Sequence, residues 1–203
     1  MHFSINKFSA FRLLPSLALL LLIVAPLVSK AQQYSVRQSK VAFTIEAPAG
    51  NLIANNEKLT GYIDISKGDL FFDLKVDQFR FVSTQMPDYL NELSTKRFCE
   101  YYLETEQYPK ASFRGKITNI ASLDLSRDGV HQIQVEGLLT MHGTSRRIVK
   151  TAVIQAQQGK LKLQTALVLK LEDFDIPVPD MLKNFFFQQV TVEVDGVLLP
   201  QIQ

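Results

Sequence analysis

One stretch carries the strongest structural signal in this chain: HQIQVEGLLTMHGTSRRIVKTAVIQAQ, residues 131–157. Before the central His-Gly-Thr, apolar residues such as Ile133, Val135 and Leu139 alternate with mostly polar ones, and the alternation resumes after it. A period of two is the pattern of a half-buried β-strand. Glycine beside short polar side chains is typical of a turn. The stretch therefore predicts an antiparallel hairpin with its turn at His142.

The same alternation recurs along most of the chain. The predicted strands cover residues 41–45, 59–65, 70–81, 111–117, 133–141, 146–157, 161–171 and 188–198. Clusters of turn-forming residues, such as 66–69 and 157–160, separate several of them. Antiparallel strands in this number leave exposed edges unless the sheet closes, and closure removes those edges. We therefore predict an all-β fold with a single antiparallel barrel of about eight strands.

Two segments break the alternation. Residues 86–103 place apolar side chains nearer to helical spacing, which predicts a short helical insertion there. The segment 174–187 contains two prolines and is therefore not a regular central strand. We predict a short helix near residues 180–185.

Residues 1–31 have the three parts of a secretory signal peptide. Basic residues come first, an unbroken apolar run follows over residues 17–25, and Ser29 and Ala31 supply small side chains at the cleavage position. The alternative is a membrane anchor, but a bilayer span needs roughly 20 apolar residues. We expect cleavage near Ala31, a periplasmic or secreted location, and one mature domain over residues 32–203.

The charge of the mature chain excludes one class of partner. The full chain has 22 basic and 20 acidic residues, and the leader holds three of the basic residues and none of the acidic ones. The mature chain is therefore nearly neutral, whereas a nucleic-acid-binding protein usually keeps a basic patch. We expect no nucleic-acid partner.

The single cysteine, Cys99, has no internal disulfide partner, and its aromatic surroundings favour a buried, unreactive thiol.

The sequence contains none of the common catalytic motifs: GxSxG, HExxH, paired CxxC and GxGxxG are all absent. Beyond the leader there are two histidines, His131 and His142, so we assign no catalytic residue, no metal site and no cofactor. We interpret His142 as a turn residue. The alternative is that His142 and Arg146 contact the head group of a ligand at the barrel rim.

Three stretches resemble the YceI-like family of exported polyisoprenoid-binding proteins. They are YLETEQYPKASFRGKI (residues 102–117), VEGLLTMHGTSRRI (135–148) and FDIPVPDMLKNFFFQQVTVEVDGVL (174–198). The resemblance extends over essentially the whole mature chain. The sequence departs from the family pattern at residues 37–39 and where MPDYLNELS follows the third strand. Polar contacts made by those positions in relatives are therefore not transferred to this chain.

The resemblance implies an elongated, lipocalin-like barrel that binds or carries a polyisoprenoid of the quinone or polyprenyl type, without catalysis. The lipid would be a ligand, not a cofactor; transient contact with a membrane or the cell envelope is compatible with this function, and the oligomeric state stays open. The apolar stripes then offer nine residues that either line a lipid cavity or fill a solid core: Phe43, Ile45, Phe72, Leu74, Phe113, Val135, Leu139, Leu167 and Leu169.

Two alternatives of other classes remain. One is a barrel packed solid that acts through its surface, as an envelope interaction or stress-response protein. The other is a hydrolase or isomerase acting on a hydrophobic substrate. The enzymatic alternative requires His131 or His142 within hydrogen-bonding distance of a carboxylate that faces a cavity.

Overall fold

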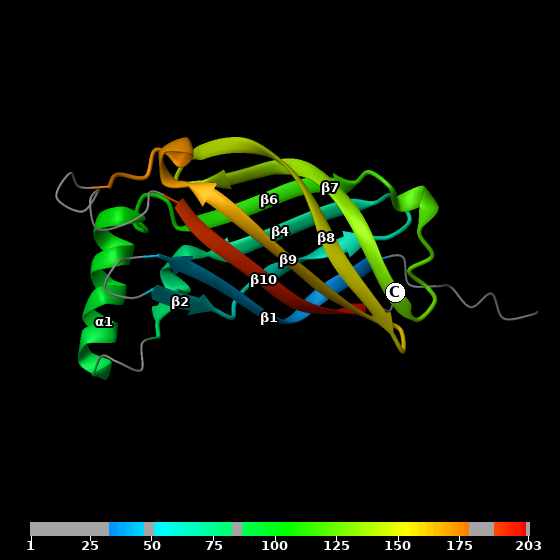
Figure 1. Cartoon of the computed structure of the whole chain (residues 1–203), viewed down its shortest axis with the longest axis horizontal. Coiled ribbons are helices and arrows are strands. Elements are labelled where there is room, and N and C mark those ends of the chain that lie inside the picture. Colours follow the sequence, from blue (N-terminus) through cyan, green and yellow to red (C-terminus); the bar gives the residue numbers. More distant parts are fainter. Residues whose placement is uncertain (1–32, 47–50, 83–86, 179–188, 202–203) are drawn as a thin grey trace, which may run out of the picture. The chain divides into compact units, whose positions relative to one another are not determined.

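The computed structural model describes residues 33–46, 51–82, 87–178 and 189–201. In this part of the chain the strands form one antiparallel sheet that closes into a barrel (Figure 1). The barrel strands are β1 (Gln33–Ile45), β3 (Thr60–Asp64), β4 (Asp69–Lys75), β6 (Lys110–Ile117), β7 (Gly129–Met141), β8 (Thr144–Gln157), β9 (Lys160–Lys170) and β10 (Gln189–Pro200). The sheet closes because β10 pairs with both β9 and β1. The predicted all-β, eight-stranded barrel is thereby confirmed.

Two short strands add to the barrel next to β1. They are β2 (Leu52–Asn56), which pairs with the second half of β1, and β5 (Arg80–Phe81), which pairs with β2. The first residues of β1 pair instead with β3. One long strand therefore contacts β3 at its beginning and β2 at its end, while β10 follows it along its whole length.

Sequence alternation missed part of this arrangement. β1 begins at Gln33, and its register against β10 shifts at Arg37, between Val36 and Gln38. A bulge of this kind inserts one residue and breaks the period of two, which explains why only residues 41–45 were predicted. The predicted strand 70–81 is also interrupted, because the 3-10 turn η1 (Val76–Gln78) separates β4 from β5.

The predicted helical insertion over residues 86–103 contains α1 (Asp88–Arg97), continued by the single π-helical turn η2 (Phe98–Tyr102). These elements lie at one end of the barrel (Figure 1). A buried hydrogen bond of 2.9 Å from the Phe81 amide to Thr95 Oγ1 attaches α1 to β5. The Phe98 ring stacks on Phe43 of β1 with a centroid distance of 4.9 Å, so the insertion covers the apolar interior at this end.

Two predictions lie outside the described residues: the signal peptide over residues 1–31 and the short helix near residues 180–185. In the described ranges, no helix has the length and apolar character needed to cross a membrane. The remaining short elements are the 3-10 turns η3 (Ile120–Ser122) and η4 (Leu171–Phe174).

Candidate ligand-binding cavity

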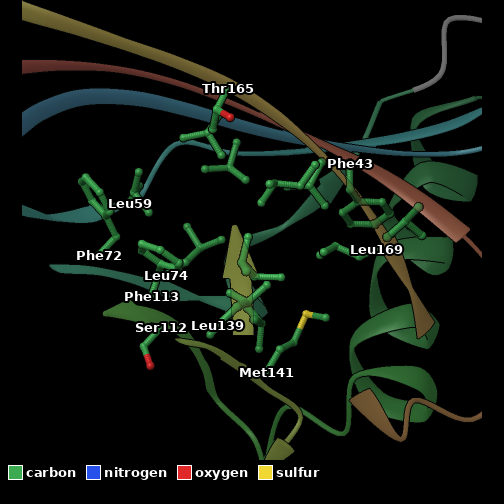
Figure 2. A pocket seen from close by; sticks show the side chains of 18 of the residues that line it. Phe43, Leu59, Phe72, Leu74, Ser112, Phe113, Leu139, Met141, Thr165 and Leu169 are labelled. Atoms are coloured by element: carbon green, nitrogen blue, oxygen red, sulfur yellow. The ribbon is translucent and has the colours of Figure 1, made fainter. Parts of the chain in front are cut away.

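The barrel contains an apolar cavity of about 200 Å³ (Figure 2). Alternate residues of β1, β4 and β6 to β10 form most of its wall, as Leu70, Phe72 and Leu74 do on β4. Residues of the α1 end, including Phe98 and Leu103, complete it. An apolar cavity of even about 150 Å³ stays dry and takes up benzene. The cavity is thus large enough for an apolar group, and its presence weighs against a solid core.

Eight of the nine residues proposed from the sequence lie on the cavity wall. They are Phe43, Phe72, Leu74, Phe113, Val135, Leu139, Leu167 and Leu169. Ile45 does not line the cavity: it is the last residue of β1, paired with Leu52 and Val190, and is buried in the same apolar cluster as Phe43. That any of the nine contacts a ligand stays a prediction.

Three polar side chains occur among the described residues that line the cavity: Ser112, Lys150 and Thr165. Thr165 Oγ1 is shielded from solvent and has no hydrogen-bond partner there, and Figure 2 shows this side chain on the wall. Sequence reasoning missed Lys150 because a lysine in a strand suggests the solvent face. The available signal was its phase, since Lys150 lies two residues from both Ile148 and Ala152 and so shares the inner face of β8 with them.

His142 forms the turn between β7 and β8, as predicted. His142 and Gly143 both have positive φ angles, 51° and 73°, the conformation of a tight primed hairpin turn. The ring is buried, which the sequence did not indicate. Its Nδ1 lies 3.2 Å from the Phe174 carbonyl oxygen and its Nε2 lies 2.9 Å from Glu104 Oε2. Tyr108 covers it with a ring-centroid distance of 4.3 Å.

The two hydrogen bonds of the His142 ring connect segments that are distant in the sequence. The two partners are a carbonyl oxygen and a carboxylate oxygen, which are both acceptors, so a ring nitrogen forms either bond by donating its N–H. His142 therefore joins three segments: the β7–β8 turn, η4 through Phe174, and the segment after η2 through Glu104. Neither His142 nor Glu104 lines the cavity.

The other candidate polar residues also lie away from the cavity wall. Arg146 is exposed, and its Nη1 donates to the Ser145 carbonyl oxygen at 3.2 Å. His131 Nε2 is buried without a partner in the described residues. The enzymatic arrangement is therefore met only in part, because His142 reaches a carboxylate that does not face the cavity. No cluster of metal-ligating side chains occurs in the described ranges.

Comparison with known proteins agrees with this architecture. The model of the YceI-like domain matches residues 32–198. The chain belongs to the YceI-like family. No curated protein matches the sequence.

Solved structures share the YceI-like fold at low sequence identity. A polyisoprenoid-binding domain from Saccharophagus degradans, implicated in plant cell wall breakdown, superposes with a TM-score of 0.69 at 17% identity, covering 83% of this chain and 98% of its own. BcnA of Burkholderia cenocepacia gives 0.62 at 15% identity, with 78% and 95% covered. The YceI protein of Campylobacter jejuni gives 0.50 at 14% identity, with 74% and 85% covered.

Proposed function

We propose that this protein is an exported carrier of an amphipathic lipid, with the apolar part of the lipid inside the barrel cavity. The observation that carries the proposal is the cavity itself, which is lined almost entirely by aliphatic and aromatic side chains. Each buried methylene group of a ligand contributes about 0.8 kcal/mol. A chain of many carbons can therefore offset the loss of translational and rotational freedom on binding, about 4–15 kcal/mol.

Family membership and the fold shared with a polyisoprenoid-binding domain support a polyisoprenoid, of the quinone or polyprenyl type, as the ligand. They also favour binding over catalysis. Export to the periplasm or the medium is supported by the signal-peptide pattern of residues 1–31, and a carrier in that compartment would collect its ligand from the envelope.

Co-purification tests the proposal most directly. The mature protein is purified from its native host, extracted with organic solvent, and the extract is analysed by mass spectrometry against an extract of unfolded protein. We expect an isoprenoid lipid in near-stoichiometric amount from the folded protein only. If folded protein yields no lipid and takes up no added isoprenoid, the carrier function is wrong.

A further inference from the structure

The strands β8 and β9 separate over much of their length. Their pairing starts next to the turn with Gln157 and Lys160, and ends with Val153 and Gln164. Beyond this point β8 still pairs with β7, and β9 still pairs with β10, so both strands remain part of the wall. Figure 1 shows β8 arching away from β9. The barrel wall therefore lacks backbone pairing along this seam.

The far end of the seam is closed again. Thr144 Oγ1 donates to Asp175 Oδ2 at 2.6 Å, and His142 Nδ1 contacts the Phe174 carbonyl oxygen. These bonds join the start of β8 to the segment that follows β9. The unpaired stretch is thus bounded at one end by the pair Val153 and Gln164 and at the other by the contacts of His142 and Thr144. We name this unpaired stretch, residues 144–152 of β8 and 165–170 of β9, the β8–β9 window.

Both sides of the β8–β9 window belong to the cavity wall. On β8 the inward-phase residues Ile148, Lys150 and Ala152 line the cavity, and on β9 Thr165, Leu167 and Leu169 do so. The outward-facing residues between them include one exposed valine on each strand: Val149 is 67% exposed and Val168 is 62% exposed. The window therefore has apolar side chains on its inner and outer faces.

Of the charged residues in the β8–β9 window, Lys150 is the one that lines the cavity. It lines the cavity and is also exposed, so it stands where the cavity meets solvent. Among the described residues it has neither an ion-pair nor a hydrogen-bond partner. Thr165, on the other side of the window, adds a hydroxyl that is shielded from water and unpartnered in the same part of the chain.

We propose that the β8–β9 window is the site where an anionic head group of the bound lipid is held, with the ammonium group of Lys150 as its counter-ion and the Thr165 hydroxyl as a second polar contact. The inference rests on the proposed lipid-binding function and adds the head-group chemistry: a phosphate or carboxylate joined to an apolar tail. Lysine is a common phosphate ligand. Its ammonium has three donors on a flexible four-carbon stem. The tail occupies the cavity behind the window.

Another role for Lys150 is purely structural. Lysine stems often cover apolar surface while the charge remains in water, and such a lysine would be indifferent to the charge of a ligand. The two roles are separated by comparing ligands that have one tail and different head groups.

The test uses the mature protein and three ligands with the same farnesyl carbon skeleton: farnesyl monophosphate, farnesoic acid and farnesol. Each ligand displaces an apolar fluorescent probe, N-phenyl-1-naphthylamine, from wild-type protein and from Lys150→Gln, Lys150→Arg and Lys160→Gln. Lys160 is an exposed lysine at the start of β9, next to the β8–β9 turn, and is not on the cavity wall, so it is a matched control.

We expect Lys150→Gln to raise the Kd for the phosphate roughly fivefold or more at low ionic strength, and less at high salt, because exposed charges are screened. Its Kd for farnesol should change less than about twofold. Lys150→Arg should retain the preference for the phosphate, and Lys160→Gln should match wild type. A parallel loss for carboxylate and phosphate indicates charge recognition alone, whereas a loss for the phosphate only identifies the phosphate as the preferred head group.

Equal effects of Lys150→Gln on the alcohol and on both acids, or no effect on either acid, would overturn the head-group proposal. Failure of wild-type protein to bind the probe and all three ligands would instead contradict the proposed lipid-binding function. Circular dichroism and thermal unfolding of each variant verify that the barrel is folded.

Discussion

At His142, backbone conformation and side-chain bonding support each other. The positive φ angles of His142 and Gly143 permit a two-residue turn, and this turn places the imidazole under Tyr108 between two oxygen acceptors. Sequence reasoning identified the turn, because glycine and short polar residues mark it. It did not identify the burial of the ring, because the partners Glu104 and Phe174 come from distant parts of the chain.

Replacement of His142 by asparagine isolates the role of the ring. Asparagine adopts positive φ more readily than most residues, so the turn is kept while the shorter side chain loses the bonds to Phe174 and Glu104. A buried acceptor without a partner costs about 1–3 kcal/mol. We expect the free energy of unfolding in urea to fall by about this amount. Glu104→Gln is the control and should cost less, because Glu104 is exposed and an amide oxygen still accepts. Equal stability of His142→Asn and wild type would contradict this role.

Cys99 is buried on η2, and burial raises the pKa of its thiol. A raised pKa keeps the thiol protonated in the pH range where an exposed cysteine begins to ionise, and the thiolate is the reactive form. We expect alkylation by iodoacetamide at pH 8 to be slow in the folded protein and to accelerate markedly in denaturant. Mass spectrometry of timed samples measures both rates. Similar rates in the two states would show that Cys99 is accessible.

At the scale of the element, glycines on three strands make room for two aromatic rings. Gly115 of β6 pairs with Gly137 of β7, and the Phe113 ring lies close to both. A Cβ atom at Gly137 would lie 2.7 Å from Phe113 Cζ and 2.4 Å from the Arg114 carbonyl oxygen. Gly61 of β3 pairs with Phe72, and a Cβ atom at Gly61 would lie 2.8 Å from Cδ1 of the Phe72 ring. These two rings, which line the cavity, thus depend on glycines at neighbouring positions of the sheet, where a side chain would collide with them.

Gly137→Ala should therefore displace the Phe113 ring and the β6–β7 pairing. Insertion of an atom into a well-packed interior typically costs about 1–3 kcal/mol, and we expect a loss of unfolding free energy of this size. Gly196→Ala is the matched control on β10, because its Cβ would meet only the Gln38 carbonyl oxygen, at 3.9 Å. Thermal unfolding compares the two variants. A stable Gly137→Ala, or an equal loss in Gly196→Ala, would contradict this account.

Strand periodicity predicted most of the strands and eight of the cavity residues. In an antiparallel barrel every second side chain points to the interior, so the apolar residues of a strand mark its inner face. It failed where pairing is irregular. The bulge at Arg37 hid half of β1, and the break at Val76 turned one predicted strand into two. The β8–β9 window was also invisible in the sequence, because alternation continues in both strands after their mutual pairing ends at Val153 and Gln164.

At the scale of the whole molecule, the packing of side chains inside the barrel determines whether there is room for a ligand. The sequence alone did not distinguish a hollow interior from a solid one, since Leu, Val and Phe suit both. Whether side chains fill a closed sheet depends on the rings and on small residues such as Ala111 and Ala152, which line the cavity from different strands. Such packing depends on side chains from several strands at once, so no local pattern in the sequence predicts it.

Filling the cavity is the corresponding prediction. Val192 lines the cavity from β10, whereas Val130 of β7 is 70% exposed on the outside, so the same change to phenylalanine is made on opposite faces of the barrel. Val192→Phe places a larger side chain in the cavity, which we propose to be the ligand site. We expect it to weaken binding of N-phenyl-1-naphthylamine and of farnesol at least tenfold, a loss of about 1.4 kcal/mol, while Val130→Phe leaves both affinities unchanged. Fluorescence titration gives the affinities, and circular dichroism verifies the fold of each variant.

If both variants bind like wild type, the cavity is not the binding site. If both lose affinity equally, the loss reflects general destabilisation, and the placement of the ligand inside the barrel loses its support.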